Sequence, residues 1–410
     1  MQNDLSILRE LAKAYAELAQ QPVNAERVGR YRELNRPKPV RPPVLVFEVP
    51  WGELRDQALR LRCVDPEARA LEDLMRKTLY QWERFQGDYA VHPYARVPIA
   101  LRQSGYGVES EERQRLSETG SDIRSHAYLD RLPDEEAAER LHLPTVELDE
   151  ALTEQRLGLY RQVFDGLLPV KKAGVSLYFA SWDQIPRLHG VENCLMDLYD
   201  RPAFAHLLIE RFTQFHEYEL TRFEELNVLD TDPYYLHCTP ACTYDLPVKD
   251  MDREKITAND VWCRAMAQLF AVVSPEMHNE FDLQYTKRLF DRCGLSYYGC
   301  CEPLDGKIEW LRQFDNLRRI SITPWAHVDA AADQIGGDFV LSYKSNPAFV
   351  ASPVFDPAPV IEETKRVLEA CKRSHTPCEF ILKDISTVRK NPDNLTAWVR
   401  TVNETIETYA

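Results

Sequence analysis

Short apolar runs of strand length recur along the chain, and segments with apolar residues at helical spacing separate them. A strand buried on both faces is a nearly continuous apolar run, whereas a helix places apolar residues every three or four positions. Strands are predicted at 44–49, 97–101, 175–179, 228–236, 295–299, 319–323, 338–342 and 378–382. Helices are predicted at 66–86, 192–199, 203–226, 261–273, 307–312, 329–335, 360–374 and 394–409. Eight strands that alternate with helices indicate an α/β protein built on a (β/α)8 TIM barrel.

Two segments stand outside this repeat. Apolar residues at helical spacing between 5 and 34, followed by a proline-rich run at 36–43, predict an N-terminal helical arm over 1–40. We interpret the arm as a helical cap on the core. The alternative is that it is a dimerisation element, in which case the protein would be a homodimer. The barrel then occupies 41–410. A charged stretch near 109–147 is interpreted as a solvated surface insertion rather than a lid.

Composition narrows the class of protein. The chain has 410 residues, of which 44% are hydrophobic, and its net charge of -15 argues against nonspecific nucleic-acid binding. No apolar stretch is long enough to span a membrane. Ten cysteines are too few for a disulfide scaffold of this length. We therefore expect a cytoplasmic protein with free thiols, in which clustered cysteines are candidates for metal binding or catalysis.

The fifth predicted strand ends in reactive side chains. It stops at Gly299 and is followed by Cys300, Cys301 and Glu302. In an α/β barrel, the loops at the carboxyl ends of the strands form the active site. The last strand ends in Lys383 and Asp384, and Glu48 lies near the end of the first strand. The predicted catalytic residues are Cys300, Cys301, Glu302, Lys383 and Asp384. The alternative is that the two cysteines are small buried hydrophobic residues.

Other strand ends supply metal-ligand and substrate-binding candidates. Thiolates, an imidazole and a carboxylate are zinc ligand types, so a metal set of Cys300, Cys301, Glu302 and His237 is predicted. Aromatic side chains would wall an apolar or aromatic small-molecule substrate, and an amine and an amide would orient its polar end. The predicted substrate-binding residues are Trp51, Trp182, Trp325, Lys344 and Asn346. For the lysines, a structural ion pair is the alternative.

Several motifs together resemble those of a known superfamily. They include Val273-Ser-Pro-Glu-Met-His-Asn-Glu-Phe281, Tyr298-Gly-Cys-Cys-Glu-Pro-Leu304 and Phe380-Ile-Leu-Lys-Asp-Ile-Ser-Thr387. From about 42 to 406 the chain resembles the uroporphyrinogen decarboxylase-like superfamily, on its cobalamin-dependent methyltransferase side and in a divergent Gly-Cys-Cys-Glu-Pro-Leu subgroup. The resemblance implies a (β/α)8 barrel that moves a methyl group from a small methylated donor to a corrinoid protein or a thiol, with zinc assistance. The corrinoid would be carried by a partner protein.

The chain also departs from the patterns of that superfamily. True uroporphyrinogen decarboxylases carry an arginine-rich stretch after the first strand, where this chain has Phe47-Glu-Val-Pro-Trp51, so porphyrinogen decarboxylation is not expected. The zinc methyltransferases carry His-x-Cys at one strand end and a further Cys at the last, and here only a Cys at 300 or 301 matches. Two alternatives therefore stay open: a metal-free decarboxylase or lyase that uses Lys383 and Asp384, and a non-catalytic binding protein.

Overall fold

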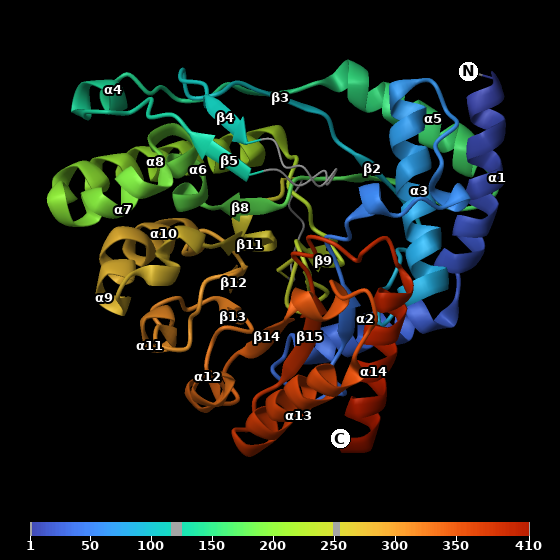
Figure 1. Ribbon diagram of the computed structural model, residues 1–410. Coiled ribbons are helices and arrows are strands. Elements are labelled where there is room, and N and C mark those ends of the chain that lie inside the picture. Colours follow the sequence, from blue (N-terminus) through green and yellow to red (C-terminus); the bar gives the residue numbers. More distant parts are fainter. Residues whose placement is uncertain (1, 116–124, 249–254, 410) are drawn as a thin grey trace.

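The computed structural model describes residues 2–115, 125–248 and 255–409 (Figure 1). Its central element is a seven-stranded parallel sheet. The strand order is β1-β15-β14-β13-β12-β11-β8, so strands that follow each other in the chain from β11 to β15 are also neighbours in the sheet. The strands are β1 (Val44–Val46), β8 (Leu177–Phe179), β11 (Trp262–Ala265), β12 (Leu295–Tyr298), β13 (Leu317–Ile322), β14 (Val340–Ser345) and β15 (Cys378–Leu382).

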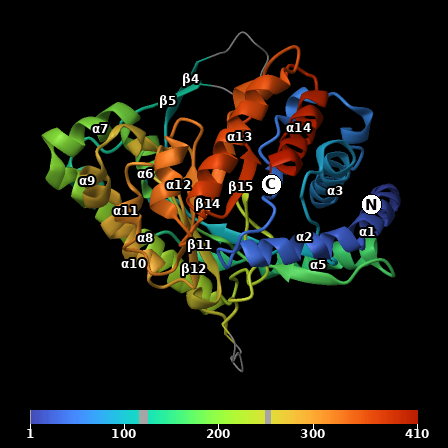
Figure 2. The ribbon, with the colours of Figure 1, turned by 90° about the horizontal axis from the view of Figure 1, so that it is seen from below.

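Helices cover the outer face of this sheet (Figure 2). They are α8 (Pro202–Leu226), α9 (Pro275–His278), α10 (Gln284–Phe290), α11 (Ile308–Leu311), α12 (Val328–Ile335), α13 (Pro357–Arg373) and α14 (Asp393–Tyr409). Helix α13 begins three residues before its predicted start at 360, because Asp356 accepts a hydrogen bond from the Ala358 amide and Pro357 suits the first turn. Its Val367 joins the outward-facing Leu341 and Phe380 in the main hydrophobic core, where all three are fully buried.

The inner face of the sheet carries buried polar side chains. Arg319 of β13 and Glu379 of β15 are both fully buried, and Arg319 Nη1 lies 2.8 Å from Glu379 Oε1. Ser342 of β14, between them in the sheet, also donates a hydrogen bond to Glu379. The inner face thus buries an ion pair beside apolar side chains such as Leu45 and Ile381.

The sheet curls without closing. Neighbouring strands lie about 4.8 Å apart, so β12 and β15, which are three positions apart, would be separated by about 14 Å in a flat sheet. Nevertheless Lys383 Nζ, just after β15, lies 2.8 Å from Cys300 Sγ, just after β12. In the described part of the chain β1 and β8 remain the two edges and do not pair. An α/β fold is therefore confirmed, whereas the predicted closed TIM barrel is not.

The second and fourth predicted strands do not join this sheet. The second corresponds to β2 (Ala95–Pro98), which pairs with β7 (Val170–Ala173) in a separate ladder. In the region of the fourth, Leu229 forms only an isolated bridge with Val175, and β9 (Tyr235–Leu236) pairs with β10 (Thr239–Pro240). Moreover, the helix predicted at 261–273 is wrong, because this segment forms β11 and then the short 3₁₀ helix η4 (Gln268–Val272).

The N-terminal segment forms α1 (Gln2–Ala19) and α2 (Pro22–Leu34). Helix α1 packs against α3 (Pro66–Phe85) and α5 (Glu150–Phe164) through a second hydrophobic cluster that includes Leu8, Leu71 and Val163. After α2, the buried Asn35 accepts a hydrogen bond from Arg319 Nε (2.7 Å). The end of the segment thus reaches the inner face of the sheet.

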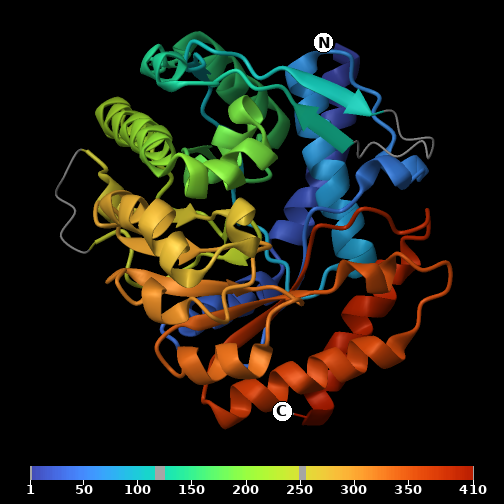
Figure 3. The same ribbon diagram turned by 60° about the vertical axis from the view of Figure 1, so that its left-hand side comes forward.

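The segment predicted as an insertion contains regular structure. Its described residues form the antiparallel pair β4 (Glu112–Arg115) and β5 (Ser125–Tyr128), drawn in cyan in Figure 3, and then α4 (Glu135–Glu139) and the start of β6 (Val146–Leu148). Residues 116–124 of the predicted insertion lie outside the described residues. None of the described helices combines the length and apolar character needed to cross a membrane.

Candidate functional site

Four of the predicted catalytic side chains meet at the carboxyl ends of β12 and β15. Lys383 Nζ donates a hydrogen bond to Cys300 Sγ (2.8 Å), and it also lies 2.9 Å from Asp384 Oδ2. Cys301 Sγ lies 2.9 Å from the same Asp384 oxygen and 3.5 Å from Cys300 Sγ, so its single S–H can donate to one of these two acceptors at a time. The sequence-based expectation that these strand ends carry adjacent reactive groups agrees with this arrangement. We call Cys300, Cys301, Lys383 and Asp384 the thiol–lysine cluster.

A glycine turn directs Cys300 toward Lys383. Gly299 has φ +95°, a value that disfavours any residue with a Cβ. A Cβ at this position would lie 2.5 Å from Leu304 Cδ1 and 3.1 Å from Ser321 Cβ. The turn is then held by Ser321, whose hydroxyl donates to the Cys300 carbonyl (2.7 Å). The strand therefore ends at Gly299 because only glycine fits the conformation that the reactive loop needs.

Glu48 links three parts of the site. Its carboxylate lies 3.0 Å from His237 Nε2, accepts a hydrogen bond from the Asp384 backbone amide (3.0 Å) and is 3.9 Å from Lys383 Nζ. Glu48, His237 and Asp384 all have positive φ values, of 50°, 60° and 55°. Non-glycine residues seldom adopt this conformation, and such strain concentrates at functional sites. Sequence analysis placed Glu48 beside the first strand but gave it no role.

The two cysteines share one proton. The hydrogen bond from the Cys301 thiol is the largest influence that lowers the pKa of Cys300, to about 3, and it outweighs burial, which raises the pKa. His237 and Lys383 lower it further. The same hydrogen bond raises the pKa of Cys301, and burial adds to that rise. At neutral pH Cys300 is therefore a thiolate, the reactive form of cysteine, while Cys301 keeps its proton.

The two basic groups beside the thiolate have raised pKa values. Burial is the largest single influence on Lys383 and lowers its pKa, but the surrounding acidic groups, of which Cys300 contributes most, together outweigh burial, so that the pKa lies well above the usual value. Similarly, burial lowers the pKa of His237, while interactions with Cys300 and Glu48 give a net increase. Lys383 is only 1% exposed, so the thiolate and the ammonium form a buried ion pair.

Glu302 supports the turn rather than facing the sulfur atoms. It is fully buried, and its two oxygens accept hydrogen bonds from the backbone amides of Cys300 (2.9 Å) and Ala267 (3.1 Å). Burial, with a further contribution from the Cys300 charge, raises its pKa to about 8. Glu302 therefore connects the turn after β12 to the end of β11.

The predicted metal set does not fit a metal ion in this arrangement. Across the described ranges, no three His, Cys, Asp or Glu side chains are grouped so that they could hold one. The Glu302 oxygens are occupied by backbone amides, and the Lys383 ammonium takes a cation's place beside Cys300. His237 does interact with Cys300, so three members of the set lie near one another without forming a ligand cage.

The predicted substrate-binding residues are dispersed. The buried Trp182 donates its indole N–H to the Phe281 carbonyl (2.7 Å), Trp51 packs beside Tyr80, and Trp325 is 67% exposed. The structure therefore does not bring the three tryptophans into one wall. Of the two polar candidates, Lys344 is buried and donates to Ser342 (2.7 Å), and Asn346 caps the short helix η6 (Pro347–Val350).

Two residues that sequence analysis missed lie on neighbouring strands. The Arg264 guanidinium of β11 stacks over the Tyr178 ring of β8, with its Cζ 3.9 Å from the ring centroid. The Tyr178 hydroxyl donates to Asp183 (3.3 Å), and Met266, just after β11, packs with Cys300. Arg264 was missed because its segment was predicted to be a helix, in which it would not point toward the strand ends.

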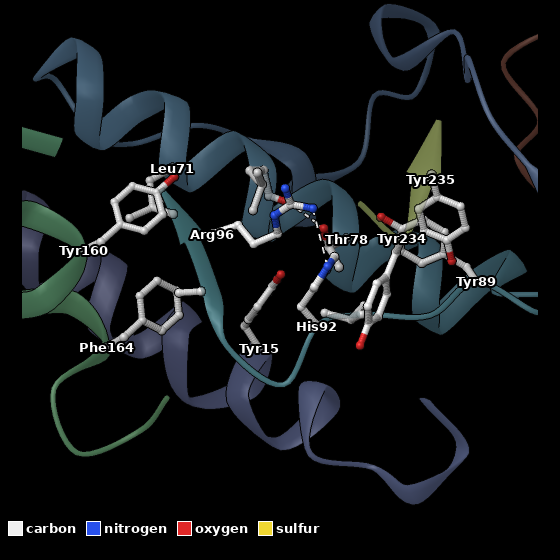
Figure 4. A pocket seen from close by; sticks show the side chains of 13 residues that line it. Tyr15, Leu71, Thr78, Tyr89, His92, Arg96, Tyr160, Phe164, Tyr234 and Tyr235 are labelled. Atoms are coloured by element: carbon white, nitrogen blue, oxygen red, sulfur yellow. Dashed lines mark hydrogen bonds between the residues drawn. The ribbon is translucent and has the colours of Figure 1, made fainter. Parts of the chain in front are cut away.

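A tyrosine-rich cavity of about 230 Å³ lies beside the sheet (Figure 4). In this view Tyr160 and Phe164 lie at one end, Tyr89, Tyr234 and Tyr235 lie at the other, and Arg96 lies between them. The cavity borders the site through Tyr235, whose ring centroid is 5.2 Å from that of Phe47, the neighbour of Glu48. Its lining comes from α1, α3, α5, β2, β9 and the segment before β2, a combination that local sequence patterns do not reveal.

Comparison with known proteins gives a likeness in fold. No protein-family model matches the chain, and no curated protein matches it. Among solved structures, a methyltransferase from Methanosarcina mazei is similar, with a TM-score of 0.50 and 11% sequence identity. The match covers 93% of this chain and 98% of that chain. The chain therefore has a methyltransferase-like α/β fold over nearly its whole length.

Proposed function

We propose that this protein is an enzyme that transfers a methyl group from a small methylated donor, and that the thiol–lysine cluster is its reaction centre. The observation that carries the proposal is the buried Cys300 thiolate beside Lys383, with protonated groups adjacent to it at the strand ends. The likeness in fold to a methyltransferase supports the same conclusion. We further propose that the chain belongs to the uroporphyrinogen decarboxylase-like superfamily, with its curled sheet as a variant of the (β/α)8 barrel.

The cluster supplies what the leaving group needs. When an acceptor attacks the methyl carbon, a new bond to carbon forms and the bond to the donor heteroatom breaks, leaving its electron pair on that atom. The departing atom then needs a proton, which a positioned acid provides. Cys301 and Asp384 share a hydrogen bond, and both have raised pKa values: for Cys301 chiefly because of its bond to Cys300, and for Asp384 chiefly because of burial. We assign them as the proton source.

The Cys300 thiolate has an electrostatic role in this scheme. A methyl group in transfer carries partial positive charge, which a fixed negative charge in a water-poor site stabilises. The same charge raises the pKa of Lys383 and of His237. A corrinoid carried by a partner protein would supply the nucleophile that accepts the methyl group, and a thiol would do so in the alternative version. No step in this scheme uses zinc, because the described side chains do not form a ligand group for it.

Methyl transfer can be tested directly. The purified protein is incubated with methyl ethers, methylamines and methyl thioethers, with cob(I)alamin or a free thiol as the acceptor, and methylated acceptor is measured. We expect Asp384→Asn to lower turnover by about 10²–10⁴-fold, because general acid catalysis typically contributes that much. Cys371→Ser, at a buried thiol on α13, is the control. Methyl transfer that survives Asp384→Asn within twofold would contradict the assignment, and metal analysis of the protein tests zinc separately.

A metal-free decarboxylase or lyase is the second candidate. The contact of 2.9 Å between Lys383 and Asp384 favours it, together with the lack of a metal-ligand group in the described ranges. In that case the thiols would be dispensable, and Cys300→Ser and Cys301→Ser would retain release of carbon dioxide or cleavage of a carboxylated substrate. Loss of that activity in either variant would count against the lyase.

A further inference from the structure

One nitrogen of the Arg264 guanidinium group has no acceptor among the described residues. Its Nη1 atom is buried and has no hydrogen-bond partner. No carboxylate in the described part of the chain forms an ion pair with it, although most of the other buried or half-buried arginines are paired or hydrogen-bonded. Buried N–H groups almost always find an acceptor, and an orphan therefore calls for an explanation. A ligand that brings its own acceptor oxygens would provide one.

The position of the guanidinium is fixed without the use of its N–H groups. Its plane rests on the Tyr178 ring at 3.9 Å. The Tyr178 hydroxyl donates to Asp183 (3.3 Å), whose carboxylate accepts a further hydrogen bond from Gln268 Nε2 (2.9 Å). Stacking on an aromatic ring orients an arginine and leaves its fork of donors free for a planar, bidentate partner. The preformed geometry lowers the entropic cost of binding such a partner.

Arg264 belongs to the same strand ends as the reactive cysteines. Met266, two residues after it, packs with Cys300, Cys301 and Ala180, and Ala180 lies two residues after Tyr178. The positive charge of Arg264 acts on His237, which in turn interacts with Cys300. Tyr178 is 36% exposed, so this side of the site is open to solvent.

We propose that Arg264, stacked on Tyr178, is an anion subsite that binds a carboxylate group of the substrate and holds its reactive part near Cys300. The subsite deepens the proposed function, and its role in turnover rests on that function, because it assigns the donor to the class of carboxylated small molecules. Carboxylate is favoured over a more highly charged oxyanion because one guanidinium fork matches one planar carboxylate. The subsite itself can be tested without methyl donor or acceptor.

Alkylation of Cys300 by two reagents that differ in charge provides the test. In both cases the thiolate sulfur attacks the CH2 carbon, an S–C bond forms and iodide leaves. Iodoacetate carries a carboxylate, whereas iodoacetamide is neutral. We expect iodoacetate to label Cys300 faster than iodoacetamide at pH 7, with a rate that saturates as reagent binds. Peptide mapping and the Cys300→Ser variant identify the labelled thiol.

The readout is the ratio of the two rate constants, so a general change in thiol reactivity cancels. Arg264→Met should lower the iodoacetate-to-iodoacetamide ratio about tenfold or more, and Arg264→Lys should retain part of the preference, because a charge-assisted bidentate contact is lost or weakened. Benzoate should slow labelling by iodoacetate in the wild type but not in Arg264→Met. Arg373→Met, at an exposed arginine on α13, is the matched control and should leave the ratio unchanged.

Two outcomes would overturn the subsite. One is a wild-type protein that reacts no faster with iodoacetate than with iodoacetamide. The other is an Arg264→Met variant with the wild-type ratio. If sulfate protects Cys300 as well as benzoate does at equal concentration, the carboxylate assignment is also wrong. Failure of methyl transfer alone, with the labelling preference intact, would refute the proposed function and leave the anion subsite standing.

Discussion

Replacing Lys383 by methionine removes the ammonium group that lies 2.8 Å from the Cys300 sulfur while keeping a side chain of similar length. At an effective dielectric constant of about 20, two unit charges at this distance attract each other by about 6 kcal/mol, equivalent to about 4 pKa units. The hydrogen bond from Cys301, which lowers the Cys300 pKa most, and the His237 interaction both remain. We therefore expect the pKa of Cys300 to rise from about 3 by about 2 to 4 units.

Ultraviolet absorbance of the thiolate measures this change. The signal of Cys300 is the difference between each protein and its Cys300→Ser counterpart, followed over a range of pH. Lys372→Met is the control, because it removes the same charge from an exposed position on α13. A wild-type thiol that titrates at the ordinary cysteine pKa would refute the ion-pair interpretation. So would a midpoint in Lys383→Met within one pH unit of the wild type.

Three further predictions concern stability, measured by urea unfolding. Gly299→Ala should destabilise the fold by about 2–4 kcal/mol, because Gly299 has a positive φ and a Cβ there would make close contacts. Gly306→Ala is the control and should cost under about 1 kcal/mol, because a Cβ at Gly306 would meet open space. Equal losses of stability in the two variants would contradict the argument that the turn requires glycine. Burial raises the Glu302 pKa from 4.5 to about 8, so its contribution to stability is present below pH 4.5 and is lost as pH rises toward 8. As pH rises between those values, the free energy of unfolding of Glu302→Gln should increase relative to that of wild type by up to about 5 kcal/mol. Stability curves of the two proteins that run parallel over this pH range would contradict this. Arg319→Met should cost about 3–5 kcal/mol by leaving Glu379 unpaired, and the double variant with Glu379→Leu should recover part of it; additive losses would show that the pair is not coupled.

The sequence predicted every strand of the central sheet except β11. The apolar runs before Gly299 and Lys383 form β12 and β15, and the residues that follow these two strands place reactive side chains next to each other. Strand β11 was missed because the segment from Trp262 onward carries apolar residues at helical spacing. Only tertiary contacts show that Arg264 faces the inner side of a curled sheet. A local pattern cannot reveal that the inner face pairs Arg319 with Glu379 across two strands.

Side-chain direction limited the prediction of the site. The position of Glu302 just after a strand predicts that it lies beside the cysteines, but it does not reveal that both carboxylate oxygens accept hydrogen bonds from backbone amides. In the same way, the three tryptophans follow strand ends in the sequence, yet Trp182 is part of a buried helical cluster. The residue types at a strand end can thus be predicted from sequence, whereas the partner of each polar atom depends on packing between distant segments.

Asn35 has a consequence for where this molecule can be cut. All of its amide groups are engaged: Oδ1 accepts from Arg319, and Nδ2 donates to the carbonyls of Cys242 (2.7 Å) and Pro240 (3.2 Å). A shortened chain starting at residue 41 would look reasonable on a sequence map, since it respects the proline-rich boundary. Such a chain would nevertheless lack the buried Asn35 side chain. The Arg319 guanidinium and the carbonyls of Cys242 and Pro240 would then lose their hydrogen-bond partner in a buried place that water does not easily reach. The N-terminal segment is thus at the end of the chain in sequence, but it completes the hydrogen-bond network in the interior of the fold.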